Sequence, residues 1–415
     1  MNPFREIAKL SRSEKFFVFF CMLCGFCIAG EYAITRPAGQ SIFLSVFSAD
    51  TLPYVWLWTI PLNFAVVTLY NRLIPRWGPL RVMGLAAAVI AAVHLFAAFF
   101  LPIYPKLIFF LFCWKDIYIL LMFKQLWSMI HSTIHSSKAK ALYGLIFGMG
   151  TLGSVLGSSV PSFFAEFLGS ERLFLLTLPV YAVLFFAYYQ SYRVSGAIGF
   201  KETIAPKEIR SSEGFSMIVK NRYLLGVLLL VIFMQVSVAL VEYQFNHEIQ
   251  FAYPIKDLRT AYMGKIMGVV NIVSLGLQFL GSFLLIHVLG LRGSHFLVPL
   301  LLSAGVIGQF FMPGFAMIAF AFVFTKSIDF SLFGVIREML FVPLNMDEKY
   351  RAKAVIDVFA YRTSKAIASF MLLGLQFLVG SMAFHLSVYL SIAIFALWMV
   401  TVAFLFRREP QPTAQ

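Results

Sequence analysis

Apolar stretches long enough to cross a lipid bilayer recur along almost the whole chain, and they limit what it can fold into. A spanning helix needs about 20 predominantly apolar residues, because the hydrocarbon layer is about 30 Å thick and a helix rises about 1.5 Å per residue. The sequence therefore predicts an all-α integral membrane protein. We expect twelve transmembrane helices, at residues 16–35, 53–71, 82–101, 107–130, 141–165, 173–190, 223–243, 262–286, 294–311, 314–336, 353–380 and 382–405.

The composition excludes a water-soluble domain as the main class of this chain. Hydrophobic residues, including 47 Phe, fill 60% of the 415 positions, and the mean hydropathy is +0.84. A soluble core of this length could not bury so much apolar surface. The formal net charge of +14 then indicates which loops are cytoplasmic, and we expect membrane lipids rather than nucleic acid as partners.

Polar segments and basic residues predict the domain organisation and the topology. Most Lys and Arg residues lie in segments on the side of the two termini, so we expect both termini to be cytoplasmic. The basic start before an apolar stretch resembles a signal peptide, but no small-residue cleavage site follows, which predicts an uncleaved first helix. We expect a cytoplasmic basic N-terminus, a six-helix bundle, a cytoplasmic linker, a second six-helix bundle and a cytoplasmic tail, at residues 1–15, 16–191, 192–222, 223–406 and 407–415.

A sequence repeat relates the two predicted bundles. The Glu-Tyr pair at Glu31 recurs at Glu242, 211 positions later, and KAKA at residues 138–141 recurs as RAKA, 213 positions later. The second spacing also places Asp116 on Asp329. Six helices per repeat give both halves the same orientation in the membrane. The sequence therefore predicts two parallel six-helix repeats around a mid-membrane cavity, as in the major facilitator architecture.

Carboxylates in or beside the predicted spans are candidates for function, because a charge in the membrane is costly unless it is paired or faces water. Glu31 and Glu242 end the first and seventh predicted helices. They either line a transport pathway at its outer side or lie at headgroup level in contact with water. The carboxylates that we expect to pair with cations or to couple transport are Glu31, Asp116, Glu242, Asp329 and Asp357.

A polar stripe is predicted on the eleventh helix. At about 100° per residue, Asp357, Tyr361, Arg362 and Lys365 fall within about 140° of arc. An excess of cations in a low-dielectric cavity suits an anionic substrate, and the tyrosine can add stacking or a hydroxyl contact. Asp357 can alternatively pair with a basic residue near the cytoplasmic end of the helix, which leaves Lys365 unexplained.

Two segments carry a resemblance to a known family. The run LWSMIHSTIHSSKAKALYGLIFGMG places Trp127 twelve residues before an Ala-Lys-x-x-Tyr turn. The run DEKYRAKAVIDVFAYRTSK, which ends at Lys365, holds Asp-Glu, then Lys-Ala-x-x-Asp-Val and a later Lys. Both resemble segments of the plastid and bacterial nucleotide transporters, the ATP/ADP translocases, and Arg36 and the segment LVEYQF at residues 240–245 echo further positions. By this resemblance the chain is identified as a divergent member of that family.

The resemblance implies transport of a nucleotide or a related phosphorylated metabolite across a bacterial inner membrane, within a major facilitator-like architecture. It maps a functional acid onto Glu242. In two places the chain departs from the family: residues 37–40 stand where it has an acid and a Lys, and Lys115 stands where it has a Glu. The substrate can therefore be a different nucleotide or another anion. The residues that we expect to bind it are Lys115, Arg362, Lys365, Tyr361 and Arg36.

We expect exchange by alternating access, in which the two bundles rock about an anion site built from Lys115, Arg362 and Lys365. The alternative is a proton-coupled major facilitator carrier or exporter of another small organic solute. Two of the candidate gating residues lie in a basic loop that either latches a gate or only marks the cytoplasmic side. We expect the protein to act as a monomer. The candidate gating residues are Arg76, Arg81, Lys140 and Lys353.

Other motifs predict packing rather than chemistry. GMGTLG, at residues 148–153, has the spacing of a dinucleotide-binding loop, but no strand precedes it, so we expect close helix packing there. Three cysteines on the first helix, and His131 and His135 at the end of the fourth, predict no metal site. The chain shows no nucleophile elbow and no phosphate-binding loop of a nucleotidase. We expect no cofactor and no enzymatic activity.

Overall fold

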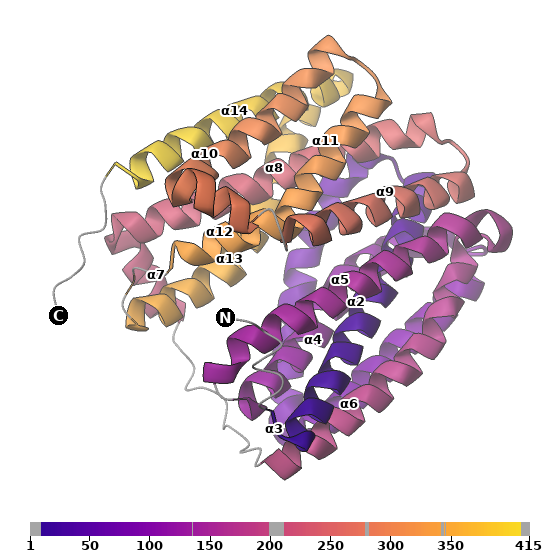
Figure 1. The fold of residues 1–415 in the computed structure, drawn as a ribbon. Helices are drawn as coiled ribbons and strands as arrows, with labels where there is room; N and C mark the ends of the chain where they lie inside the picture. The colour runs from indigo at the N-terminus through magenta and orange to yellow at the C-terminus, as the bar shows by residue number, and fades with distance from the viewer. Residues whose placement is uncertain are drawn as a thin grey trace. The chain divides into compact units, whose positions relative to one another are not determined.

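The computed structural model describes residues 10–134, 136–198, 211–278, 282–341, 344 and 346–407. Figure 1 shows these residues folded into helices that run past one another. The helices are α2 (Arg12–Val46), α3 (Leu52–Phe100), α4 (Ile108–Thr133), α5 (Ser136–Leu168), α6 (Leu178–Ile198), α7 (Ser211–Lys220), α8 (Arg222–Ala252), α9 (Lys256–Gly276), α10 (Ser282–Phe311), α11 (Phe315–Ile328), α12 (Gly334–Met339), α13 (Met346–Val379) and α14 (Ala383–Leu405).

Short segments of other helical types join or extend these elements. A single π-helical turn, Asp329–Phe333, connects α11 to α12. The 3-10 helices are η1 (Ala49–Thr51), η2 (Pro105–Leu107), η3 (Glu171–Thr177) and η6 (Gly380–Met382).

Local sequence explains where several helices begin and bend. Ser11 caps α2, because its hydroxyl accepts from the Glu14 amide at 3.2 Å and its own amide donates to the Glu14 carboxylate at 2.8 Å. Gly78 and Gly290 interrupt α3 and α10 with φ values of 74° and 66°, a conformation that suits glycine. Both glycines fall in the short polar breaks GPLR and LGLRG.

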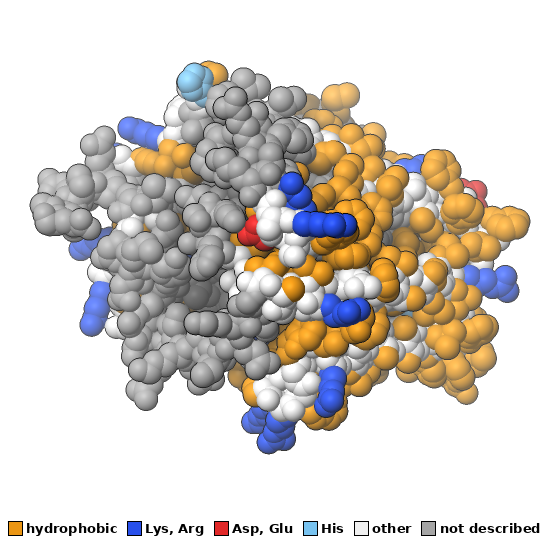
Figure 2. Space-filling model, turned by 60° about the horizontal axis from the view of Figure 1, so that its bottom comes forward, with side chains coloured by type: hydrophobic (Ala, Val, Ile, Leu, Met, Phe, Trp, Pro, Cys, Tyr) orange, Lys and Arg blue, Asp and Glu red, His pale blue; other side chains and the backbone are white. Residues whose placement is uncertain are grey.

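Eight helical segments among the described residues are long and apolar enough to cross a membrane. Two of them, Ala49–Phe100 with 52 residues and Ala360–Leu405 with 46, are far longer than the about 20 residues that one crossing needs. The chain is therefore an all-helical, multi-pass membrane protein. Figure 2 shows broad hydrophobic surface beside Lys and Arg side chains, as expected for a protein whose flanks face lipid and whose polar ends face water.

The described residues group into two compact units. The first unit takes its residues from 1–47, 58–204 and 253–271, and the second from 48–57, 205–252 and 272–415. Each unit thus contains one segment from the other half of the sequence. The described part of the predicted linker is helical at both ends, because α6 continues to Ile198 and α7 begins at Ser211.

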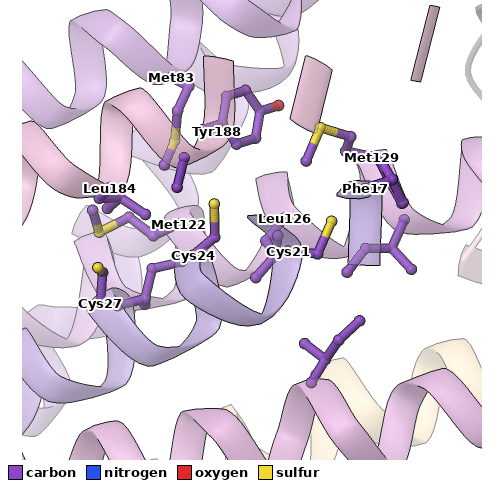
Figure 3. Packing of buried hydrophobic residues seen from close by; sticks show 14 of the residues in the cluster. Phe17, Cys21, Cys24, Cys27, Met83, Met122, Leu126, Met129, Leu184 and Tyr188 are labelled. Carbon is purple, nitrogen blue, oxygen red and sulfur yellow. The ribbon is translucent and has the colours of Figure 1, made fainter. Parts of the chain in front are cut away.

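In the first unit, α2 is the central helix and packs against α4, α5 and α6 (Figure 1). Its core at one end is rich in sulfur: Cys21, Cys24 and Cys27 pack with Met122 and Tyr188 (Figure 3). Cys113 is buried as well, so all four thiols of the chain are free and buried. The cysteines act as small apolar side chains that let neighbouring helices approach.

Glycines bring α2 and α5 into backbone contact. A Cβ atom added at Gly153 would overlap the backbone carbonyl of Phe26, and one added at Gly157 would overlap that of Gly30. Only glycine permits such an approach without moving a helix. This confirms helix packing as the role of Gly153 in GMGTLG.

The segment Tyr253–Asn271 is tied into the first unit by polar contacts. The Arg259 side chain is 2% exposed and donates hydrogen bonds to the Ser41 carbonyl at 2.9 Å, the Ser41 hydroxyl at 3.1 Å, the Ser45 hydroxyl at 2.5 Å and the Tyr253 carbonyl at 3.1 Å. Lys256 pairs with Glu171 at 2.6 Å. One buried guanidinium therefore holds the start of α9 against the end of α2.

In the second unit, α8 is the central helix and packs against α11, α13 and α14 (Figure 1). Phe245 stacks on Phe322 with ring centroids 4.1 Å apart. The exchanged segment 48–57 joins this unit, where Tyr243 donates to Asp50 at 2.7 Å and Gln250 accepts from the Ala49 amide at 3.2 Å. Aromatic packing and polar anchors thus position the end of α8.

Candidate functional site

Glu31 lies at the centre of a buried polar cluster in the first unit. Its side chain is 1% exposed, and Tyr118 donates a hydrogen bond to its Oε1 atom at 3.0 Å. The Thr35 and Tyr118 hydroxyls are 3.0 Å apart. The Oε2 atom of Glu31 is buried and has no hydrogen-bond partner among the described residues. The carboxyl group is therefore surrounded by neutral hydroxyls, and only one of its oxygens is satisfied.

His94 of α3 completes this cluster. Its Nδ1 atom lies 3.7 Å from Glu31 Oε1, 3.0 Å from the Thr177 hydroxyl and 3.2 Å from the Tyr181 hydroxyl. Thr177 donates its own hydrogen to the Phe174 carbonyl at 2.7 Å. The contact between Thr177 and His94 therefore assigns a hydrogen to Nδ1, on the side of the ring that faces Glu31.

A second group of charges adjoins this cluster on α2 and α4. The Lys115 ammonium and the Tyr32 hydroxyl both donate to Asp116 Oδ1, each at 3.3 Å. Lys115 also lies 3.8 Å from the centroid of the Phe112 ring, and the Arg36 guanidinium lies 5.9 Å from that of Tyr32. Arg36 and Lys115 are each 7% exposed. Two buried cations thus lie on aromatic faces, and one of them, Lys115, also contacts an acid.

A small cavity joins the two groups. It has a volume of about 10 Å³, close to the minimum for one water molecule, and is lined by Thr35, Gly39, His94, Leu111, Lys115, Tyr118 and Phe174. Residues of both groups, His94 and Tyr118 on one side and Lys115 on the other, therefore line one small cavity.

In the second unit, Glu242 pairs with Lys326 at 2.7 Å, and both side chains are buried. Glu31 and Glu242, which share a Glu-Tyr pair in the sequence, therefore differ in their neighbours: Glu242 meets an ammonium, whereas Glu31 meets hydroxyls and an imidazole. Asp329 begins the π-helical turn and accepts from Gln235 at 2.7 Å. Each acid in this group has a donor.

The polar stripe of the predicted eleventh helix lies on α13. The Lys365 ammonium is 5.7 Å from the centroid of the Trp56 ring, and the Tyr361 hydroxyl accepts from Arg337 at 3.1 Å. Arg362 is half-buried. Asp357 lies on α13, but its side chain is outside the described residues. Lys365 and Arg362 belong to the second unit and Lys115 to the first, so their convergence on one site stays a prediction.

The candidate gating residues have varied surroundings. Arg76 and Arg81 are exposed on either side of the kink at Gly78. Lys353 donates to Glu338 at 2.5 Å, which links α12 to α13. The side chain of Lys140 lies outside the described residues. Their gating roles stay predictions.

Several residues of these clusters were not singled out from the sequence. His94 is a lone histidine in an apolar span, a signal that was available but not used. Tyr118, Thr177 and Tyr181 are ordinary residues for a membrane helix and gave no signal. Arg259 lies between two predicted spans, where a basic residue gives no signal of a buried anchor. Among the described residues, no group of three or more His, Cys, Asp or Glu is placed to hold a metal ion.

The model of the TLC ATP/ADP transporter family matches residues 107–321 and 314–408. This match spans well over half of the sequence. The chain belongs to the TLC ATP/ADP transporter family. The match includes α4, α11 and α13, which carry Lys115, Lys326 and Lys365.

Curated relatives of this TLC family member are ADP,ATP carrier proteins. ADP,ATP carrier protein 1 of Chlamydia muridarum is 24% identical, over 90% of this chain and 84% of that protein. The protein of the same name from Chlamydia trachomatis is 23% identical over the same shares. ADP,ATP carrier protein 1 of Rickettsia typhi is 26% identical over 40% of this chain and 37% of that protein. The chain is therefore a divergent member of the family.

Solved structures show the fold of this TLC family member. A bacterial homologue of the iron transporter ferroportin, in an inward-facing state, has a TM-score of 0.69 at 13% identity and covers 96% of this chain and 100% of its own. A point mutant of the nucleoside transporter NupG has a TM-score of 0.64 at 12% identity and covers 94% and 99%. The fold is that of major facilitator-like transporters. The TLC chain is a membrane transporter and not an enzyme.

Proposed function

We propose that this chain exchanges nucleotides across a bacterial inner membrane by alternating access. The observation that carries the proposal is the family match over residues 107–408, together with ADP,ATP carrier relatives that align with 90% of the chain. Nucleotides are polyanions, so a carrier must offer them cations inside the membrane.

The buried charges support this substrate class. Lys115 and Lys326 each lie against a carboxylate, at 3.3 and 2.7 Å, and a phosphate can replace a carboxylate as their partner. Lys365 and Trp56 together offer an ammonium beside an aromatic ring, a combination that suits a phosphate and a base. We therefore assign substrate binding to Lys115, Arg362, Lys365, Tyr361 and Arg36.

The proposal includes twelve membrane crossings in two six-helix repeats. The segments Ala49–Phe100 and Ala360–Leu405 are each long enough to cross twice, which gives ten crossings from the eight apolar segments. The charged helix α4, with 26 residues, and α9, with 21, are long enough to supply the other two. An even number of crossings places both termini on the same side of the membrane. The exposed Arg76 and Arg81 support the assignment of that side to the cytoplasm.

In this mechanism the two repeats move so that the central site opens first to one side of the membrane and then to the other. When no substrate is bound, the acids pair with the cations and compensate their charge. An empty site that holds paired charges reorients slowly, which favours exchange over net uptake. Lys353, which contacts Glu338, is the candidate gating residue at the cytoplasmic end of α13. A single chain contains all of these groups, which supports a monomeric carrier.

The test is exchange by purified protein in lipid vesicles. Vesicles are loaded with unlabelled ADP, and uptake of labelled ATP is measured for the native protein, Lys365→Ala and Lys365→Arg. We expect uptake that depends on internal nucleotide. We expect Lys365→Ala to lower it about 10- to 100-fold, because a charge-assisted contact to phosphate is worth about 1.5–3 kcal/mol.

Two comparisons make this result interpretable. Lys365→Arg keeps the charge, so it should retain more uptake than the alanine variant, although an Arg does not replace a Lys without loss. Folded native protein that takes up no nucleotide under any loading would contradict nucleotide exchange and direct the search to other anions.

A further inference from the structure

The buried Glu31 carboxyl group cannot remain an uncompensated anion inside the membrane. Its side chain is 1% exposed, Oε1 accepts a hydrogen bond from Tyr118, and Oε2 accepts none from the described part of the chain. A carboxylate in a low-dielectric interior costs several kcal/mol unless a cation compensates it. The group must therefore bind a proton or lie next to a group that does.

His94 is the base that can hold this proton instead of Glu31, and because Nδ1 already carries a hydrogen, the imidazolium would hold the second proton on Nε2. Its Nδ1 atom lies 3.7 Å from Glu31 Oε1 and carries the hydrogen that the Thr177 hydroxyl accepts. Two arrangements remain: a protonated carboxyl beside a neutral imidazole, or a carboxylate beside an imidazolium. Both contain one proton more than the charged acid beside the neutral base.

The other groups that face Glu31 do not supply the missing charge. The α4 helix contributes Tyr118, the 3-10 helix η3 contributes Thr177, α6 contributes Tyr181, and α2 itself contributes Thr35. On α5, glycine backbone faces this part of α2. Lys115 and Asp116 lie close by, but they are 3.3 Å from each other and so compensate one another first. Arg36 lies over the Tyr32 ring.

The repeat provides an internal comparison. Glu242 occupies the matching position of α8 and has the Lys326 ammonium at 2.7 Å, which keeps its carboxylate charged without a proton. Within the described ranges, the ion-pair partner of Glu31 is the His94 imidazole at 3.7 Å rather than an ammonium. The two halves therefore use the same acid in two ways, as an ion pair in the second unit and as a proton acceptor in the first.

We propose that Glu31 and His94 form a one-proton site, and that this proton leaves and returns during transport, so that carrier turnover depends on pH. The water-sized cavity lined by His94, Tyr118 and Lys115 places the site next to the candidate substrate cation. The proposed pH dependence of turnover rests on the proposed nucleotide exchange. The proton site itself does not.

The first experiment measures the unfolding midpoint temperature of the purified full chain in detergent from about pH 5 to pH 8. The folded pair holds one proton, whereas in the unfolded chain His94 loses its proton above about pH 6.5 and Glu31 above about pH 4.3. Above about pH 6.5 the folded state therefore binds more protons, so stability falls as the pH rises, by up to tenfold in the folding constant per pH unit.

Glu31→Gln isolates this contribution, because glutamine mimics the neutral acid and cannot release a proton. We expect its midpoint to fall less steeply with pH than that of the native protein above about pH 6.5. Glu166→Gln, at an exposed position on α5, is the matched control and should keep the native slope. Parallel curves for the native protein and Glu31→Gln would overturn the proposal.

His94→Asn tests whether the imidazole takes part in the one-proton site. Without His94 the unfolded chain holds no proton at this pair above about pH 4.3, while the folded chain still protonates Glu31. The decline in stability should then begin about two pH units lower than in the native protein. An unchanged onset would remove His94 from the site.

The second experiment measures nucleotide exchange in vesicles with equal pH on both sides. The native rate should vary with pH between about 6 and 8, and the rate of Glu31→Gln should be flat where any exchange remains. A pH-dependent rate that Glu31→Gln reproduces would overturn the coupling. If the native protein exchanges no nucleotide, the proposed function fails, while the unfolding curves still decide the proton site.

Discussion

Glu242 and Lys326 show at the scale of single residues what a buried ion pair does in this chain. Their charges lie 2.7 Å apart and both side chains are buried. Such a pair adds little net stability compared with apolar residues, because both charges lose their hydration. Removing one partner is different, since it leaves the other charge buried beside fewer compensating groups. The pair therefore acts as a unit.

We expect Glu242→Gln to lower the free energy of unfolding by about 3–5 kcal/mol. Combining it with Lys326→Met should recover most of that loss, because the second change removes the remaining ammonium. Unfolding curves of the two single variants and the double variant give the coupling energy. The exposed Glu166→Gln should change stability by less than about 0.5 kcal/mol. Additive losses in the double variant would contradict a direct pair.

The sequence revealed charged residues more readily than their partners. Glu31, Lys115 and Asp116 were visible because charges are rare in apolar spans. Their actual neighbours were not visible, since Tyr118, Thr177 and Tyr181 come from three different elements and are common residues. The choice of Lys326 as partner of Glu242 likewise depends on how α8 packs against α11, which spacing alone does not give.

At the scale of helices, the contact between α2 and α5 depends on the absence of side chains. Phe26 and Gly30 place their carbonyl oxygens where a Cβ atom of Gly153 or Gly157 would lie. Around Gly30 the two helices therefore meet through backbone surfaces, whereas side chains such as Ile146 pack against α2 nearer its start.

We expect Gly157→Ala to lower the free energy of unfolding by about 1–3 kcal/mol or more, because the methyl group forces the two helices apart. Gly144→Ala is the control on the same helix, since an added Cβ there meets no atom within 4 Å among the described residues. That change should be neutral or stabilise by up to about 1 kcal/mol, as expected when alanine replaces glycine in a helix. Thermal unfolding distinguishes the two, and equal effects would contradict the packing role.

The sequence predicted that helices exist, but it did not predict every local irregularity within them. The apolar windows predicted a helical, multi-pass membrane chain, and the breaks GPLR and LGLRG marked the kinks at Gly78 and Gly290. The π-helical turn at Asp329–Phe333 gave no sequence signal, because one extra residue in a helical turn leaves hydrophobicity unchanged. It alters the direction of every side chain that follows, including Arg337.

At the scale of the whole chain, each compact unit includes a segment from the other half. Arg259 is one anchor of Tyr253–Asn271 within the first unit: three of its four hydrogen bonds reach Ser41 and Ser45, and the fourth stays within the segment at Tyr253. No signal in the sequence indicated this exchange, because an ionic anchor in a short loop looks like any other loop charge. Polar contacts from Arg259, Asp257 and Lys256 therefore position Tyr253–Asn271 together.

We expect Arg259→Leu to accelerate backbone hydrogen exchange throughout Tyr253–Asn271, because it removes hydrogen bonds that are worth about 1.5–3 kcal/mol each when the donor is charged. Arg292→Leu, an exposed arginine on α10, should leave these amides unchanged. Mass spectrometry of peptides from the exchanged protein measures both. Protection that survives in Arg259→Leu would show that the other contacts of the segment dock it without this guanidinium.

The burial of all four thiols has a practical consequence for watching this carrier move. A water-soluble maleimide reacts with accessible thiolates, so Cys21, Cys24, Cys27 and Cys113 should react slowly in the folded protein. A single cysteine introduced at an exposed loop position then becomes the fast-reacting label without prior removal of the native thiols. Fluorophores or spin labels would then attach mainly to the introduced cysteine. They could report the side of the membrane to which the carrier is open.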